Sequence, residues 1–261
     1  MTRGWLNLLA LATGAGLLVA VLFPIGVLAQ EDEIEAALGQ SRSGTTVREL
    51  QAQAIAEPPK TDDRHELAVF YHKRGMANQR LGRYEQAVED LRLALAGNPD
   101  NRPAPDGWGD RGRIQFDLGN TLVARGAWFE AIDHYRTMGL EYRERNLFLY
   151  HSAQLELGNA LSVLGQFADA EAALREANNT LPRLRTLKGW ARRGDGSLRH
   201  NASVNAAFLE RQGRHAEAER RRRSALEDAK KHVEILSSTL SPGNESQFVR
   251  NAVRIVASTK V

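Results

Sequence analysis

Two asparagines have side chains suited to binding another protein, and each occurs in the same local context. Asn120 ends a Leu-Gly-Asn tripeptide, and so does Asn159. A side-chain amide both donates and accepts hydrogen bonds, so it can satisfy the main chain of an extended peptide without reading its side chains. This chemistry predicts partner binding at Asn120 and Asn159. The alternative is that both asparagines merely cap or tolerate the local backbone.

Covalent, metal and cofactor chemistry have no recognisable motif in the chain. There is no cysteine, which removes thiol nucleophiles, thiolate metal sites and disulfides. There is also no P-loop, no dinucleotide-binding glycine motif, no His-Glu-x-x-His and no Gly-x-Ser-x-Gly. Four histidines, His72, His134, His151 and His200, are predicted to lie on different helices. We therefore expect a protein that is not an enzyme and that binds no metal or cofactor.

Positive charge is concentrated toward the C-terminus. The net charge is only +3, yet residues 181–232 hold fourteen Arg or Lys against six Asp or Glu. The densest run is Arg220, Arg221, Arg222 and Arg223. Such a patch would attract an acidic protein segment, an anionic lipid or a wall polymer. The alternative is a solvated helix whose arginines face acids one turn away. Nucleic acid is disfavoured, because no aromatic residues interleave with the arginines.

These residues belong to a sequence that repeats itself. A Gly, a ring two residues later and an Ala three residues after the ring recur four times. The four hexads begin at Gly82, Gly126, Gly165 and Gly213. Seven positions before these glycines stand the small residues Gly75, Gly119, Gly158 and Ala206. A recurrence of this kind in register predicts stacked helical hairpins, because no single hairpin can bury its own apolar face.

The pattern resembles the tetratricopeptide repeat family, most closely in the second and third hexads. The resemblance covers about residues 64–232 and implies units at about 68–101, 112–145, 151–184 and 199–232. It implies an all-α fold, a right-handed α-solenoid of helix-turn-helix repeats with a concave inner face. The turn glycines are 44, 39 and 48 residues apart, whereas the family period is about 34. The units therefore resemble the longer ones of kinesin light chains.

Each unit should be two amphipathic helices, A and B, joined by a tight turn. The turn glycine supplies a left-handed backbone conformation that a side chain would penalise. The small residue should lie where helix A meets helix B, and the ring should open helix B. Residues 102–110 are a predicted loop, residues 146–150 should lengthen the flanking helices, and residues 185–198 are a Gly- and Arg-rich insertion. The fourth unit has His215 in place of the ring and is predicted to be a capping unit.

The resemblance also implies where a partner binds. Helix A lines the inner surface in this family, which places Asn120 and Asn159 there. The same stripes carry Gln115, Phe116, Ser152, Leu155, Asn201 and Asn205. The basic set with which some members bind acidic C-terminal tails is replaced here by His72, Phe116, Leu155 and Glu156. A tail-carboxylate clamp is therefore not expected.

The two ends of the chain differ from the repeats. Residues 1–29 combine Arg3, an apolar run and small residues before a cleavage position, which is typical of a signal peptide. An uncleaved membrane anchor is the alternative, and both export the remainder. Residues 30–63 are predicted lead-in helices and a linker, with a capping box from Thr46 to Glu49. Residues 233–261 are predicted capping helices.

Together these patterns predict a non-catalytic protein-protein interaction scaffold in the cell envelope, periplasmic or extracellular. A dedicated chaperone or assembly subunit of a secreted or membrane enzyme complex is the alternative function.

Overall fold

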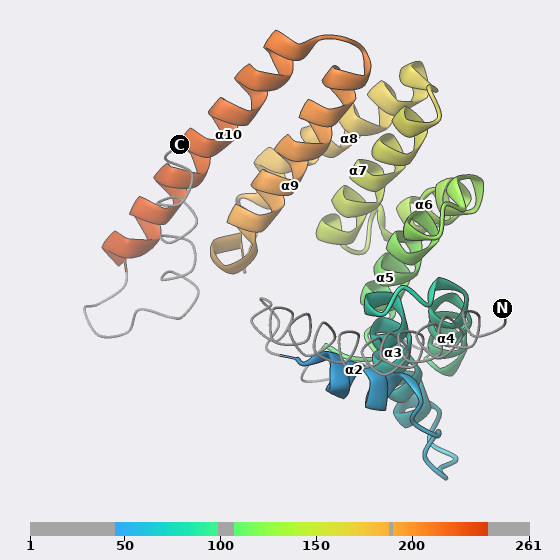
Figure 1. Cartoon of the computed structure of the whole chain (residues 1–261). Helices are drawn as coiled ribbons and strands as arrows, with labels where there is room; N and C mark the ends of the chain where they lie inside the picture. The colour runs from blue at the N-terminus through green and yellow to red at the C-terminus, as the bar shows by residue number, and fades with distance from the viewer. Residues whose placement is uncertain (1–44, 99–106, 188–189, 240–261) are drawn as a thin grey trace, which may run out of the picture.

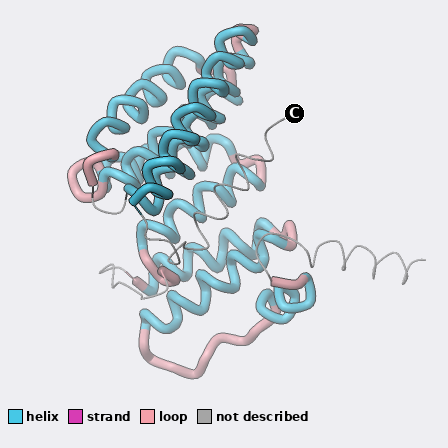
Figure 2. The backbone as a smooth tube through the Cα atoms, turned by 90° about the vertical axis from the view of Figure 1, so that its left-hand side faces the viewer, coloured by secondary structure: helices cyan, strands magenta, loops and turns pink. Residues whose placement is uncertain are grey.

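The described chain consists of helices that pack in consecutive pairs (Figure 1). The computed structural model describes residues 45–98, 107–187 and 190–239. The helices are α2 (Val47–Ala54), α3 (Arg64–Arg80), α4 (Tyr84–Gly97), α5 (Arg111–Ala124), α6 (Trp128–Tyr142), α7 (Leu147–Val163), α8 (Phe167–Leu184), α9 (Trp190–Arg211) and α10 (His215–Thr239). Figure 2 shows loops between them and no strand in this part of the chain. The predicted all-α fold is confirmed.

Four hairpins follow the lead-in helix α2: α3 with α4, α5 with α6, α7 with α8, and α9 with α10. Their turns contain Gly82, Gly126, Gly165 and Gly213, whose φ angles are +74°, +82°, +74° and +77°. A residue with a Cβ atom is strained in this left-handed region. The role predicted for the turn glycines is confirmed. The second helix of each pair begins at the ring position or its histidine equivalent, as the hexad pattern predicts.

The small residues before the turns allow the paired helices to approach closely. A Cβ atom on Gly119 would lie 2.5 Å from a ring carbon of Tyr135. A Cβ atom on Gly158 would lie 2.6 Å from Leu174 Cγ, and one on Gly75 would lie 3.1 Å from Leu91 Cγ. These glycines therefore sit at the A–B contact, as predicted, and a larger side chain would push the helices apart.

One continuous core runs through the pairs. It contains fully buried side chains from successive helices, among them Leu91, Ile114, Tyr135 and Leu161. Val204 and Phe208 of α9 extend this core into the fourth pair. No pair could bury these side chains alone, which is why the pairs must stack.

The lead-in helix α2 is fixed by the capping box expected from the sequence. Thr46 Oγ1 accepts a hydrogen bond from the Glu49 main-chain N–H at 3.2 Å, and Glu49 Oε2 accepts one from the Thr46 N–H at 2.8 Å. Arg74 then ties three helices together. Its guanidinium contacts Asp90 of α4 at 2.6 Å and donates to the Ala56 carbonyl oxygen, just after α2, at 3.0 Å.

The last pair differs from the expected boundaries. The predicted unit begins at residue 199, whereas α9 begins at Trp190 and includes most of the predicted insertion. Leu198 packs with Leu184 in a second small core, and this contact favours helix over the loop-forming tendency of the nearby glycines. Helix α10 continues past the predicted boundary at residue 232 to Thr239, because no Pro or Gly interrupts residues 215–239.

The predicted export segment, the first lead-in helix, most of the loop at 102–110 and the end of the C-terminal caps lie outside the described residues. Within the described residues, no helix is both long and apolar enough to span a membrane.

Candidate partner-binding surface

Helices α3, α5, α7 and α9 are the first members of the four pairs, and each contacts the next one along the stack. Their shared surface is called the A-helix surface below. It holds all the asparagine positions singled out from the sequence. Its geometry is set by hydrogen bonds that run from one A helix to its neighbour.

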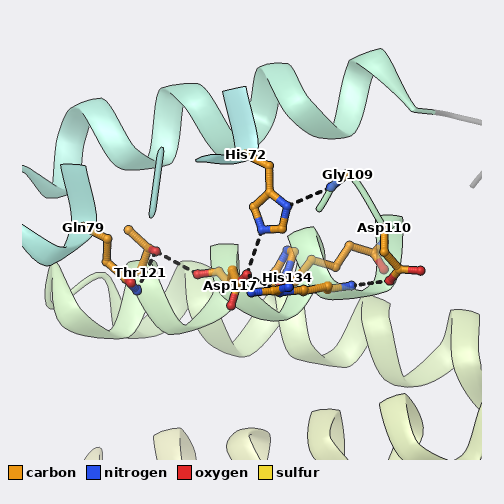
Figure 3. Close-up of polar contacts among 9 residues, drawn as sticks. His72, Gln79, Gly109, Asp110, Asp117, Thr121 and His134 are labelled. Atoms are coloured by element: carbon orange, nitrogen blue, oxygen red, sulfur yellow. Dashed lines mark hydrogen bonds and ion pairs between the residues drawn. The ribbon is translucent and has the colours of Figure 1, made fainter. Parts of the chain in front are cut away.

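The first link joins α3 to α5 through a fully buried histidine (Figure 3). His72 Nε2 lies 2.8 Å from Asp117 Oδ2, and His72 Nδ1 accepts a hydrogen bond from the Gly109 N–H at 3.1 Å. Because Nδ1 is an acceptor here, the ring proton is on Nε2 and is donated to Asp117. Asn98 Nδ2 donates to the Gly109 carbonyl oxygen at 2.6 Å. The loop before α5 is therefore held from both sides.

A second link lies two turns further along α3 and one turn further along α5. Gln79 Nε2 donates to Thr121 Oγ1 at 3.0 Å, and Thr121 in turn donates to the Asp117 carbonyl oxygen at 2.7 Å (Figure 3). Both groups are thus occupied within the protein. In this stretch of the A-helix surface, the two polar side chains therefore hold α3 and α5 together.

Helices α7 and α9 are joined by a comparable set of contacts. Glu156 Oε1 pairs with His200 Nε2, and this hydrogen bond raises the pKa of His200. Arg211 Nη1 donates to Asn159 Oδ1 at 3.2 Å and to Ser162 Oγ at 2.7 Å. Asp117 and Glu156 occupy equivalent positions in successive pairs, since each comes two residues before the small glycine. Each carboxylate receives a histidine from a neighbouring A helix.

The two predicted asparagines differ in how much binding capacity remains. Asn120 Oδ1 accepts a hydrogen bond from the Tyr135 hydroxyl at 2.8 Å, while its Nδ2 group donates to no other described residue. Asn159 uses both ends: Oδ1 accepts from Arg211, and Nδ2 lies 3.4 Å from Glu156 Oε2. Both side chains are half-buried. Asn120 therefore retains two N–H donors for a ligand, and Asn159 mainly helps to join α7 to α9.

The other predicted residues do not form one surface. Phe116 and Ser152 are half-buried and lie on neighbouring helices α5 and α7. Gln115 is buried and donates to Glu141 Oε2 at 2.7 Å, and Leu155 is 1% exposed in the core. Asn201 and Asn205 are also buried: Asn205 Nδ2 donates to the Asn201 carbonyl oxygen at 2.8 Å, and Asn205 Oδ1 accepts from Asn178 of α8 at 3.0 Å.

The four histidines lie on different helices, as predicted, and each is engaged locally. Burial lowers the pKa values of His134 and His151, whose rings contact the carbonyl oxygens of Gln115 and Ala177 at 2.7 and 3.0 Å. The described residues contain no group of His, Asp and Glu that could hold a metal ion.

The arginine run lies on the exposed side of α10. Arg222 makes two hydrogen bonds to Glu210, Arg223 contacts Glu219 Oε1 at 2.7 Å, and Arg221 contacts Asn178 Oδ1 at 3.2 Å. Arg220 has no hydrogen-bonded partner in the described segments. The alternative that the sequence left open, an acid one turn away on the same helix, holds for Arg223 with Glu219, whereas Arg222 pairs with Glu210 of the preceding helix α9.

Asp117, Ser162 and Arg211 shape this surface but are not among the site residues predicted from the sequence. Asp117 could have been found, because it and Glu156 are acids at the same repeat position. Arg211 could not have been found from the sequence, because its contacts with Asn159 and Ser162 depend on how α9 packs against α7.

Comparison with known proteins agrees with the helix pairs. A tetratricopeptide repeat profile matches residues 68–101, which is the first predicted unit. The chain is similar to the crystal structure of the apo form of RapI, with 15% identity, a TM-score of 0.50, and coverage of 76% of this chain and 72% of that one. At this identity the likeness concerns the fold alone. Sequence comparison with curated proteins finds no significant match. Residues 68–101 therefore match a tetratricopeptide repeat, and the described part of the chain is all-helical, with a fold similar to that of RapI.

Proposed function

We propose that this chain is a non-catalytic interaction scaffold that binds an extended segment of another protein on the A-helix surface at Asn120. The observation that carries this proposal is the unused Nδ2 group of Asn120, whose Oδ1 atom is fixed by Tyr135 at 2.8 Å. Because the amide cannot rotate without losing this bond, its two N–H groups have a fixed direction. Fixed donors on a rigid helix suit a peptide carbonyl oxygen.

The neighbouring side chains complete such a site. Phe116 precedes Asn120 by one helical turn on α5, so the two share a face. Phe116 is half-buried and packs on the core, which leaves part of its ring available to an apolar side chain. Ser152 lies on α7, the next A helix, which contacts α5. A partner segment would place a carbonyl oxygen on Asn120 and an apolar side chain on Phe116.

The proposal includes the cellular location of the protein. The pattern at residues 1–29 motivates export to the cell envelope, in a periplasmic, extracellular or membrane-tethered form. N-terminal sequencing of the mature protein should begin at Gln30, and an intact Met1 would argue for an anchor instead. The lengthened units, like those of kinesin light chains, give longer A helices for the partner. A dedicated chaperone or assembly subunit of an exported enzyme complex would use the same surface.

A single substitution tests the binding site. Asn120→Asp keeps an oxygen to accept from Tyr135 but removes both N–H donors. We expect recovery of the partner in affinity capture with the tagged full chain to fall about tenfold, which corresponds to about one hydrogen bond. Asn159→Asp is the matched control, because that side chain is already engaged by Arg211. Equal recovery with Asn120→Asp and the unchanged chain would exclude Asn120 as a binding residue.

A further inference from the structure

The exposed face of α6 carries a short apolar and charged stripe. Phe129 and Leu140 are 72% and 79% exposed and, with Ile55, are the three most exposed of the large apolar side chains in the described residues. Asp133 and Arg136 lie between them, with side chains 78% and 51% exposed that contact each other at 3.4 Å. The four positions follow one another at four, three and four residues, so they form a straight line along one face of the helix. This line is called the α6 stripe below.

The repeat itself does not require these side chains. The positions equivalent to Phe129 are Glu85 in α4 and Ala168 in α8. The positions equivalent to Leu140 are Ala96 and Asn179. Neither flanking helix places a large apolar group at either position. Phe129 and Leu140 therefore serve something other than the packing of helix pairs, since their own burial in this chain is slight.

The α6 stripe is symmetric about its centre. Phe129 and Leu140 are centred on the same point as Asp133 and Arg136, between His134 and Tyr135. If a second α6 is laid antiparallel over the first, Phe129 therefore faces the second copy's Leu140. At the same time Asp133 faces the second copy's Arg136, and each contact occurs twice. Apolar groups then meet apolar groups and opposite charges meet, as a two-fold interface requires.

We propose that two copies of this chain associate through the α6 stripe in a two-fold antiparallel arrangement. The stripe spans about 16 Å of helix, because each residue rises by 1.5 Å. Such a span supports an interface at the small end of the usual size range, so the dimer should dissociate at micromolar concentrations. The charges set register and orientation, and the two apolar contacts, one at each end, supply most of the affinity.

This arrangement leaves the proposed binding surface uncovered. The α6 stripe lies on the second helix of its pair, whereas Asn120 lies on α5, a first helix. A dimer would therefore present two separate A-helix surfaces, and a partner with two binding segments would gain avidity from both. The dimer does not depend on the identity of any partner.

Sedimentation velocity of the full chain tests the association over 1 to about 200 µM, a range chosen to bracket a micromolar dimer. We expect a monomer–dimer equilibrium for the unchanged chain. Phe129→Ser/Leu140→Ser should remain monomeric throughout, with an unchanged circular dichroism spectrum. Leu93→Ser is the matched control: this leucine of α4 is 48% exposed but lies outside the stripe, so the dimer should persist. A monomeric unchanged chain, or a dimer that survives the double substitution, would overturn the proposal.

Charge reversal tests the antiparallel register. Asp133→Arg alone and Arg136→Asp alone should each weaken the dimer at least tenfold, since like charges then meet twice. An equimolar mixture of the two variants should form a heterodimer, because one copy supplies two positive and the other two negative charges. The combined variant Asp133→Arg/Arg136→Asp should regain the dimer. Failure of both the mixture and the combined variant to associate would exclude this register.

Discussion

The Nε2 atom of His72 lies 2.8 Å from Oδ2 of Asp117, and this hydrogen bond joins the first helices of two successive hairpins. The histidine side chain is completely buried, and its other ring nitrogen is occupied by the Gly109 N–H. The His72–Asp117 pair therefore links α3 to α5 inside the protein. It also fixes the loop that leads into α5.

The first prediction concerns this bond. Asp117→Ala would leave the buried Nε2–H of His72 without an acceptor, and we expect a loss of about 1–3 kcal/mol in the free energy of unfolding. Asp117→Asn retains an acceptor oxygen at the same place, so its loss should be clearly smaller. Urea unfolding of both variants measures the difference. Equal stability of Asp117→Ala and the unchanged chain would show that His72 finds another partner.

The second prediction concerns the contact between α5 and α6. Gly119→Ala puts a Cβ atom 2.5 Å from the Tyr135 ring, so the ring must move and lose its bond to Asn120. We expect a destabilisation of about 1–3 kcal/mol, as for other overpacked cores. Gly196→Ala is the control, because no atom lies within 4 Å of its added Cβ and alanine favours the helix. In thermal unfolding, the melting temperature should fall for Gly119→Ala and stay equal or rise for Gly196→Ala.

The third prediction concerns pH. The hydrogen bond to Glu156 raises the pKa of His200 above its ordinary 6.5. A raised pKa stabilises the fold fully below about pH 6.5, and the contribution is lost as the pH rises through the folded value. His200→Gln should therefore cost most at low pH and least above the folded pKa. The side chain is half-exposed, so the effect should stay below about 1 kcal/mol.

His134 and His151 change stability with pH in the opposite direction, but they do not hide the effect of His200. Burial lowers the pKa values of His134 and His151, so their contribution is present above about pH 6.5 and lost as the pH falls through their folded values. His134 and His151 are present in both the unchanged chain and His200→Gln. Their contributions therefore largely cancel when the unfolding free energy of one protein is subtracted from that of the other. Urea unfolding at several pH values gives this difference, with the exposed His215→Gln as control. A difference that grows with pH would contradict the assignment.

The fourth prediction concerns the arginine run on α10. Glu210, Glu219 and Asn178 take up three of its guanidinium groups. We therefore expect a variant with all four arginines replaced (Arg220→Gln, Arg221→Gln, Arg222→Gln and Arg223→Gln) to bind the partner with the same salt dependence as the unchanged chain. Binding measured between low and high salt checks this. A weaker affinity together with a flatter salt dependence would instead identify an acidic partner that contacts the run directly.

The sequence determined the repeating parts of the molecule. Four turn glycines, the rings after them and the small residues before them fix the hairpins, because each feature follows from local backbone geometry or from the separation of two helices. The first helix of each pair could be recognised in the same way. Asn120 could be proposed as a binding residue from its position alone.

Which of the two asparagines remains available for a partner depends on contacts between helices that are distant in the sequence. Tyr135 and Arg211 reach Asn120 and Asn159 from other helices, and neither contact follows from the spacing of residues along the chain. Burial of Leu155, Asn201 and Asn205 likewise depends on how neighbouring pairs stack. The early start of α9 has the same origin, since Leu198 is held by Leu184 of the preceding pair. Local patterns specify a hairpin, but the contacts between hairpins combine side chains that the sequence keeps far apart.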